Sequence, residues 1–365
     1  MSLSTAGICS RSACVEQLED RRLLSGAWSL LSAELMGIAP ATAPNASVAH
    51  FPTAKRAQAR AAHVITWTPI APSPIPRFES AAEVVGGKMY VFGGFIDAQV
   101  HATSRSDVYE PHKNTWTQIA DMPEPLTHTG HVVIGHDIWF AGGFVGDEGN
   151  VISPSTADVW IYHTKNNTWT PGPPLPAPRG AGALVKVGSK LHFFGGLETR
   201  AADQGEHWVL NLHKLKLGWV PAAPLPVAVN HLAGVTLGGK IYAIGGQHLW
   251  NEDTQNVDNV QVYNTHKDTW VDAAPLPEPR GHIADSTFVV GGKIVVAGGA
   301  TNGIPALSDV IVFRPSKHTW TGLTSFPAGR RAPVARAIGG KIIVATGDPG
   351  DVSATVEAWM SSHAV

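Results

Sequence analysis

The sequence predicts an all-β propeller of six blades, because two series of residues repeat in step along most of the chain. Five apolar segments end in a pair of glycines, and a sixth ends in Thr-Gly. The first position of the pair is occupied by Gly93, Gly142, Gly195, Gly245, Gly298 and Thr346. Six tryptophans repeat at nearly the same intervals: Trp67, Trp116, Trp169, Trp219, Trp270 and Trp320. Each series spans 253 residues in five steps, and a period near 50 residues is typical of a four-stranded blade.

Each unit supplies four strands, a to d, as the fifth unit illustrates. Its strands a and b flank the tight turn VGGK, where glycine can take a positive φ. A variable loop follows, then strand c, which ends in an aromatic residue seven positions before the tryptophan of strand d. The pairs are Tyr109 with Trp116, Tyr162 with Trp169, Tyr263 with Trp270, and Phe313 with Trp320. Leu212 stands in that place before Trp219, so we expect a less well-packed third blade.

The two ends of the repeat region complement each other. The last unit has strands a and b from Ala332 to Ala345 and a strand c ending at Trp359, but no strand d. Trp67 belongs to a strand d with no preceding strands. We therefore expect the N-terminal strand to complete the last blade, which removes two exposed sheet edges. The propeller domain then spans residues 63–365.

The glycine pair, the aromatic residue and the tryptophan resemble the kelch repeat of the galactose oxidase-like superfamily. Copper radical oxidases of this kind need a cysteine crosslinked to tyrosine, and both cysteines here, Cys9 and Cys14, precede the propeller. That activity is excluded. The iron motif Glu-x-x-x-Asp-x-x-x-His of plant specifier proteins is also missing. Bacterial sialic-acid (N-acetylneuraminate) mutarotases are six-bladed kelch propellers that use carboxylate and arginine groups, so a carbohydrate epimerase of that type is the alternative to a binding function.

Residues 1–62 differ in character from the repeats. The segment LEDRRLLS, Leu18 to Ser25, resembles the LEPR-XLL motif on predicted extracellular proteins of planctomycete bacteria. The resemblance implies an exported protein, secreted or held at the bacterial cell surface. Ala39 to Ala62 is rich in Ala and Pro and is typical of a disordered linker. The alternatives are a wrongly assigned start codon or a short amphipathic helix.

Composition limits the partners. A formal net charge of −2 and 15% charged residues leave no basic surplus for nucleic acid. No apolar run is long enough to span a membrane. The propeller has no cysteine, and the 17 histidines show no spacing that requires a metal ion. We therefore expect a monomer without metal or cofactor, whose partner is a protein or a carbohydrate.

The b–c loops and the d–a connections of a propeller share one face, here called the loop face, where we expect the site. Trp250 lies off the repeat pattern in the fourth b–c loop, beside His248 and Glu252. It could stack on a sugar ring, or it could fold back over its own loop. Other loop-face candidates are Arg105, Glu198, Arg200 and Asn302.

The d–a connections repeat a proline-arginine signature at Arg77, Arg179, Arg280, and Arg330 with Arg331, which is replaced by His128 in one unit and by Asn230 with His231 in another. A ring of guanidinium groups could receive a carboxylate or phosphate. Alternatively, each arginine could bind carbonyl groups of the neighbouring blade, which the repetition favours.

Aligning the units on the lysine of the a–b turn exposes one irregularity. Glu83 and Arg336 occupy an otherwise apolar position of strand a, in two blades that become neighbours on closure. They could pair at the closing seam or act as an acid and an electrophile in the channel. His131 and His282 both follow a glycine at the start of strand a. The pattern as a whole favours a non-catalytic module that binds a glycan or a protein through the loop face.

Overall fold

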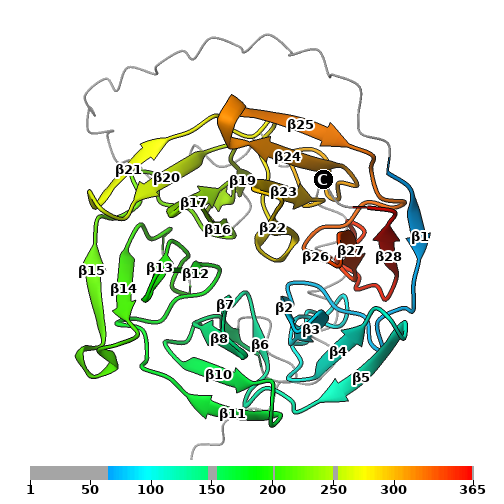
Figure 1. Ribbon diagram of the computed structural model, residues 1–365, viewed down its shortest axis with the longest axis horizontal. Coiled ribbons are helices and arrows are strands. Elements are labelled where there is room, and N and C mark those ends of the chain that lie inside the picture. Colours follow the sequence, from blue (N-terminus) through cyan, green and yellow to red (C-terminus); the bar gives the residue numbers. More distant parts are fainter. Residues whose placement is uncertain (1–64, 147–153, 200–201, 250–253, 364–365) are drawn as a thin grey trace, which may run out of the picture. The chain divides into compact units, whose positions relative to one another are not determined.

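The computed structural model describes residues 65–146, 154–199, 202–249 and 254–363, which form six antiparallel four-stranded sheets around a central axis (Figure 1). The all-β prediction is confirmed. Helical structure in these residues is limited to three 3-10 turns, namely η2 (Leu215–Leu217), η3 (Ala284–Ser286) and η4 (Pro315–Lys317). Among the residues described, no helix is long and apolar enough to cross a membrane.

Each blade contributes strands a, b, c and d from the axis outward. The first three blades consist of β2 (Ala81–Val85), β3 (Lys88–Phe92), β4 (Ser106–Glu110) and β5 (Thr115–Ile119); β7 (Gly130–Ile134), β8 (Asp137–Ala141), β10 (Val159–His163) and β11 (Thr168–Pro171); and β12 (Ala183–Val187), β13 (Lys190–Phe194), β14 (His207–Asn211) and β15 (Trp219–Ala222).

The other three blades have the same order. They consist of β16 (Ala233–Leu237), β17 (Lys240–Ile244), β20 (Val260–Asn264) and β21 (Thr269–Asp272); β22 (Thr287–Val290), β23 (Lys293–Ala297), β24 (Val310–Arg314) and β25 (Thr319–Leu323); and β26 (Val334–Ile338), β27 (Lys341–Ala345), β28 (Ala358–Ser361) and β1 (Trp67–Pro69). Two short pairs lie outside the blades: β6 (Leu126–Thr127) with β9 (Phe144–Val145), and β18 (Gln247–His248) with β19 (Gln255–Asn256).

The ring closes through the N-terminal strand, as the sequence predicts. Strand β1 is the outermost strand of the sixth blade and pairs antiparallel with β28, with Trp67 opposite Ser361 and Pro69 opposite Trp359. Both ends of the described chain therefore lie on one blade, and both free edges that an open ring would leave are covered.

The repeated tryptophans fasten each blade to the one before it. In all six blades the indole N–H donates a hydrogen bond of 2.8–3.2 Å to a backbone carbonyl just after strand d of the preceding blade. Trp67 makes the bond that closes the series, to the carbonyl of Thr324. Each tryptophan therefore packs in the hydrophobic core between blades and also hydrogen-bonds its blade to the preceding one.

The glycine pair makes a second set of links between neighbours. The second glycine of each pair donates its N–H to the carbonyl of the residue in the arginine place of the next blade, as from Gly143 to Arg179 and from Gly246 to Arg280. A side chain on the first glycine would collide with the same carbonyl, and the backbone there has positive φ. These contacts also correct the alignment of the d–a connections. Leu126 and Val229 occupy the arginine place in the second and fourth blades, rather than His128 and Asn230 with His231.

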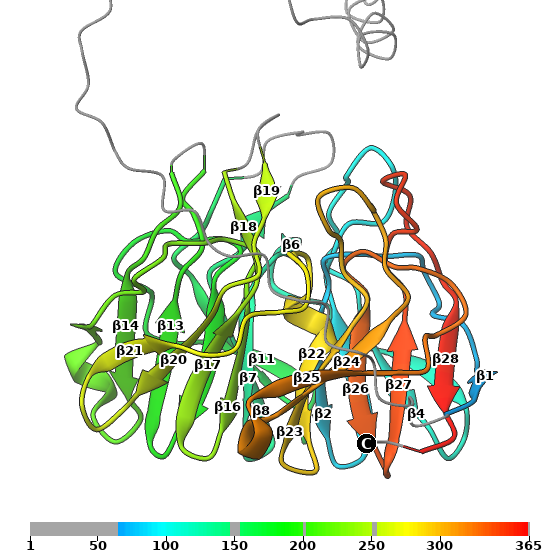
Figure 2. The same ribbon diagram turned by 90° about the horizontal axis from the view of Figure 1, so that it is seen from above.

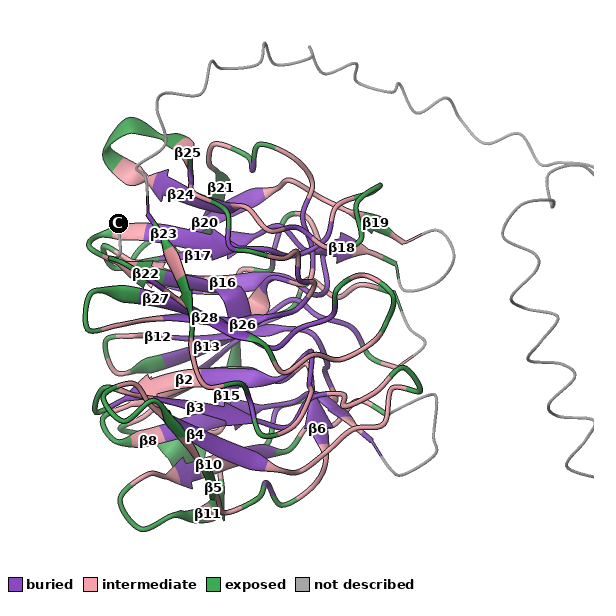
Figure 3. Ribbon diagram, turned by 90° about the vertical axis from the view of Figure 1, so that its right-hand side faces the viewer, coloured by how far each residue is buried: buried purple, intermediate pink, exposed green. Residues whose placement is uncertain are grey.

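The third blade is not less well packed than the others. Leu210, and not Leu212, lies opposite Trp219, because the c–d turn is lengthened by η2. Leu210 is fully buried and Trp219 is 9% exposed. The hydrophobic core lies between neighbouring blades; one cluster, for example, joins the fourth and fifth. The loops of the loop face extend beyond the sheets at one end of the propeller (Figure 2), and burial is concentrated in the sheets (Figure 3).

Candidate functional site

The six innermost strands enclose a central cavity of about 490 Å³. Its lining includes Thr129 and Leu232 toward the loop face, and Lys186 and Val289 beside the a–b turns. Most of the lining is apolar or small, so the few ionisable groups within it stand out. Glu83, His131 and Arg336 line the cavity, and Asp285 contacts His131 and Arg336. We call these four residues the channel cluster.

The channel cluster is a closed network centred on the His131 imidazole. Its Nδ1 lies 2.9 Å from Glu83 Oε1, and its Nε2 lies 2.8 Å from Asp285 Oδ1. Arg336 donates a 2.5 Å hydrogen bond to the Asp285 carbonyl, and its guanidinium lies 3.8 Å from both carboxylates. Two carboxylates thus face one imidazole and one guanidinium, all in a largely buried setting.

This arrangement fixes the charge state of its members. Burial by itself would lower the pKa of His131, but Asp285 and Glu83 outweigh it and raise the pKa to about 9. Burial would raise the pKa of Glu83, yet the hydrogen bond with His131 and the charge of Arg336 bring it below its ordinary value. At neutral pH the cluster therefore holds an imidazolium between two carboxylates.

Asp285 enters the channel because the fifth blade carries two extra residues. Thirteen positions separate Arg280 from Lys293, whereas eleven separate Arg77 from Lys88 and the equivalent residues of the other blades. The extra residues form η3, which places Asp285 where a strand a residue would otherwise be. When the units are aligned on the lysine of the a–b turn, the apolar Phe288 falls at the position of Glu83 and Arg336. That alignment therefore gave no sign of Asp285. The unequal spacing was the signal that could have revealed it.

A second group of ionisable side chains lies on the axis at the loop-face end. The residue two places after the arginine place has φ between 47° and 57° in every blade: Glu79, His128, Ala181, His231, His282 and Ala332. Backbone hydrogen bonds join several of these around the ring, as from Ala181 N to His128 O at 3.0 Å. Glu79, His128, His231 and His282 form what we call the axial cluster.

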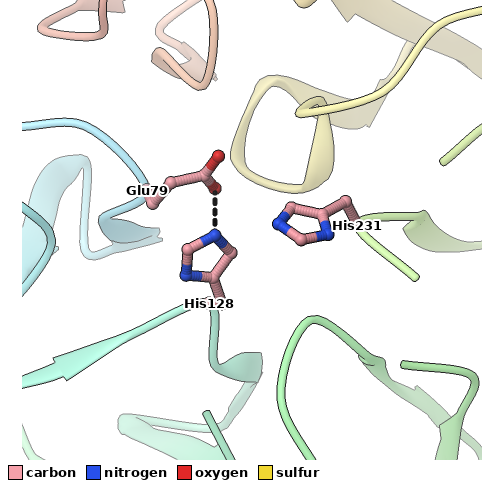
Figure 4. A group of neighbouring side chains, drawn as sticks. All are labelled: Glu79, His128 and His231. Atoms are coloured by element: carbon pink, nitrogen blue, oxygen red, sulfur yellow. Dashed lines mark ion pairs between the residues drawn. The ribbon is translucent and has the colours of Figure 1, made fainter. Parts of the chain in front are cut away.

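Figure 4 shows the side chains of Glu79, His128 and His231 pointing toward one another. Glu79 Oε1 lies 2.5 Å from His282 Nδ1, and Glu79 Oε2 lies 3.5 Å from His128 Nε2. The His231 ring contacts the rings of His128 and His282, with centroids 4.7 Å apart in both pairs. The sequence analysis missed this cluster because it grouped His282 with His131, as both follow a glycine. The structural equivalent of His282 in the second blade is instead His128, three residues before His131.

Burial and the imidazoles shape the electrostatics of the axial cluster. Burial would raise the pKa of the Glu79 carboxyl, but His128, His282 and His231 outweigh it and hold the pKa well below its usual range. Burial lowers the pKa of His128 and lowers that of His231 further. The cluster accordingly combines the Glu79 carboxylate with the neutral imidazoles of His128 and His231.

Two of the sequence-predicted arginines are fully buried and already paired. Arg77 binds Asp107 at 2.5 Å and donates to the carbonyl of Gly93. Arg280 binds Asp309 at 2.8 Å and donates to the carbonyl of Gly298. Both guanidinium groups hold the glycine pair of their own blade, which leaves no free bidentate donor for a ligand.

Arg179 and Arg330 are also buried, whereas Arg331 and Arg105 are partly exposed. Arg179 pairs with Glu206 and stacks on Trp208, and Arg330 pairs with Glu357 and stacks on Trp359. Arg331 pairs with the buried Asp348, and Arg105, with about a third of its side chain exposed, pairs with Asp107 at 3.0 Å.

The structure places the remaining loop-face candidates in different settings. His231 belongs to the axial cluster, Glu198 is exposed, and His248 pairs with Asp203 at 3.1 Å. Asn302 belongs to a cleft of about 570 Å³ between the b–c loops of the fourth and fifth blades, which is lined by Thr254, Gln255, Asn256, Thr301 and Asn302. Arg200, Trp250 and Glu252 lie outside the described residues.

Glu83 and Arg336 are brought together as expected, but their closest partners are other residues. Their side chains lie 3.8 Å apart, whereas His131 lies 2.9 Å from Glu83. The seam between the first and sixth blades is thus part of a network that also reaches the second and fifth blades.

Comparison with known proteins agrees with this architecture. The model of the KLHDC2/KLHL20/DRC7 Kelch-repeats domain matches residues 56–196 and 171–347. The solved structure of YjhT is similar with a TM-score of 0.65 and 16% sequence identity, over 80% of this chain and 96% of that chain. At that identity the likeness shows the fold alone. No curated protein matches the chain. Because 703 chains of solved structures match, the fold by itself does not select a function.

Proposed function

Since the chain belongs to the KLHDC2/KLHL20/DRC7 Kelch-repeats domain family, we propose that it is a non-catalytic binding module that recognises a glycan or a protein through its loop face. A rigid ring of blades holds six variable b–c loops at one end, which is how scaffolds present binding residues. A glycan is the ligand that the described part of this face favours.

The observation that carries this preference is the composition of the cleft between the fourth and fifth blades. All five lining residues are uncharged and carry hydroxyl or amide groups: Thr254, Gln255, Asn256, Thr301 and Asn302. Such groups donate and accept hydrogen bonds, as sugar hydroxyls also do. The two loops are fixed to each other, because Asn302 accepts from the Asn256 N–H at 2.6 Å and donates to the Asn256 carbonyl at 3.0 Å. The cleft is therefore pre-organised.

The test is a glycan array probed with the purified full chain, followed by titration of any hit. Asn302→Ala removes both contacts to Asn256 and should weaken glycan binding at least tenfold. Asn166→Ala serves as the matched control, because Asn166 is an exposed asparagine in a c–d turn on the opposite face. Equal binding by both variants would contradict the assignment of the cleft. A folded chain that binds no glycan would leave a protein as the loop-face ligand, to be sought by crosslinking at Gln255.

A carbohydrate epimerase of the mutarotase type is a second candidate, supported by the channel cluster. The cavity of about 490 Å³ is large enough for a monosaccharide and contains both carboxylate and arginine groups. Against it, Glu83 and Asp285 are already engaged by His131, and general acids and bases work best with a pKa near the operating pH. Exchange between N-acetylneuraminate anomers, followed by NMR, decides: acceleration by the chain that is lost in Glu83→Gln would favour the enzyme.

Export remains a proposal that rests on the sequence of residues 1–62. Fractionation of cells that produce the full chain, with N-terminal sequencing of the product, tests it. Protein found only inside the cell with an intact N-terminus would contradict it.

A further inference from the structure

We propose that Glu79, His128 and His231 of the axial cluster bind a divalent transition-metal ion, with Zn²⁺ as the preferred ion. One ligand atom from each of these side chains can be chosen so that all three lie within 4.8 Å of one another. The residues come from three blades, the first, second and fourth, and meet on the axis (Figure 4). Their convergence therefore depends on the closed ring and not on any local sequence motif.

The spacing agrees with coordination. Two ligands that each lie about 2.1 Å from a metal at the tetrahedral angle are about 3.4 Å apart. Glu79 Oε2 and His128 Nε2 are 3.5 Å apart. Two imidazoles and one carboxylate form a donor set that suits Zn²⁺ and its neighbours in the transition series, whereas Mg²⁺ and Ca²⁺ prefer oxygen ligands alone. Three protein ligands leave at least one coordination position for water or another donor.

The groups behind the ligands orient them as in known metal sites. A metal-bound histidine usually uses its second ring nitrogen in a hydrogen bond that fixes the ring. Here His128 Nδ1 lies 2.9 Å from Thr127 Oγ1, and His231 Nδ1 lies 2.5 Å from Asn230 Oδ1. In both cases the partner is the preceding residue, and the hydrogen bond at Nδ1 fixes the orientation of the ring.

His282 has a different part in the same site. Its Nδ1 lies 2.5 Å from Glu79 Oε1, the oxygen that does not approach His128. We therefore assign His282 as a positioning residue, which holds the carboxylate so that Oε2 faces the other two ligands.

The backbone and the burial of the site indicate selection for more than packing. The Glu79, His128 and His231 backbones are left-handed, with φ of 52°, 54° and 51°, which costs a residue other than glycine about 1 kcal/mol or more. Alanine occupies the equivalent place in two blades, so a large polar side chain is not needed to form the ring. A buried carboxylate is costly unless it is paired or binds a metal, and the described ion-pair partners of Glu79 are imidazoles only.

The test measures metal binding directly. The full chain is prepared with Cys9→Ser and Cys14→Ser, because these thiols lie outside the described residues and could bind Zn²⁺ themselves. After treatment with EDTA, it is titrated with Zn²⁺ by calorimetry and with Co²⁺ by absorption spectroscopy. We expect one tight equivalent of Zn²⁺ per chain, d–d bands typical of nitrogen and oxygen ligands with Co²⁺, and a higher Tm with Zn²⁺ than with EDTA.

Three variants and one control make the result specific. Glu79→Gln and His231→Asn should each remove the tight site, and His282→Asn should weaken Zn²⁺ binding by about 10- to 100-fold. His266→Asn, at an exposed histidine in a c–d turn, should bind as the parent chain does. Glu79→Gln keeps the shape of the original side chain and one carbonyl oxygen, so we expect this variant to fold. It therefore keeps the test valid even if the His231→Asn variant does not fold. A parent chain that takes up no Zn²⁺, or folded Glu79→Gln protein that binds it equally tightly, would overturn the proposal.

Discussion

His131 Nε2 lies 2.8 Å from Asp285 Oδ1, although the two residues are 154 positions apart and belong to the second and fifth blades, on opposite sides of the axis. The contact spans the channel at its centre. The same Asp285 oxygen accepts the backbone N–H of Ala82 in the first blade at 2.9 Å. The Asp285 carboxylate therefore joins three blades, and we expect its loss to destabilise the ring.

Asp285→Asn should destabilise the propeller by about 2 kcal/mol, since it removes one charge from a buried network but keeps an amide oxygen for hydrogen bonds. Unfolding by urea, followed by tryptophan fluorescence, measures the change. Asp272→Asn is the control, because Asp272 is exposed and on an outer strand. A difference under about 0.5 kcal/mol between the two variants would show that the cross-channel contact does not stabilise the ring.

His131 should make stability fall at alkaline pH. Its folded pKa of about 9 lies above the ordinary value of 6.5, so its contribution is complete below pH 6.5 and is lost as the pH rises to 9. The loss is on the order of 3 kcal/mol. His131→Gln should be less stable than the parent chain at pH 6 and nearly equal to it at pH 9.5. A gap that stays constant over this range would contradict the assignment.

His192 and His207 should make the fold sensitive to acid. They are buried side by side, with ring nitrogens 2.8 Å apart, and burial lowers their pKa to about 3 and about 4. Their contribution is therefore complete above pH 6.5 and is lost as the pH falls toward 4. His192→Gln should lower the slope of stability against pH by about 1.4 kcal/mol per unit in this range. The exposed His266→Gln variant should keep the parent slope.

Arg280→Ala should cost about 3 kcal/mol of stability, because it leaves Asp309 and the carbonyl of Gly298 without their buried partner. Arg105→Ala should cost less than about 1 kcal/mol, as the side chain is partly exposed and Arg77 still pairs with Asp107. Denaturant titrations of both variants compare the two. A small effect at Arg280 would return that residue to the set of candidate ligand-binding groups.

The blades could be predicted from sequence because their determinants recur at fixed places. In each unit the second glycine of the pair donates its N–H to a carbonyl of the next blade, and the tryptophan donates its indole N–H to a carbonyl of the previous blade. Closure by β1 followed from the same logic, since an unpaired strand at one end matched a missing strand at the other.

The clusters on the axis could not be predicted in the same way. Glu79, His128 and His231 are similar only in their place after the arginine position, and two blades lack an arginine there. The proline-arginine pattern pointed to arginines such as Arg77 and Arg280, whose guanidinium groups hold the glycine pair of their own blade. In the fifth blade, η3 adds two residues between the arginine of the d–a connection and the lysine of the a–b turn. An alignment on that lysine therefore misplaces the residues near the arginine. Convergence on an axis depends on the radius and closure of the ring, which repeat spacing alone does not supply.

The pairing of β1 with β28 has a topological consequence. The Thr66 N–H donates a hydrogen bond of 3.1 Å to Ser362 Oγ, so the two ends of the described chain are neighbours where β1 pairs with β28 in one blade. The described propeller chain thus returns to its starting point, and its two ends meet within the sixth blade. A short peptide could join the two ends, and the break could be moved to an exposed a–b turn such as Gly238–Gly239, which would retain the hydrogen bonds that the tryptophans and the glycine pairs make between blades. Circular permutants would then differ from the natural chain in the order in which blades form, while sharing its finished ring.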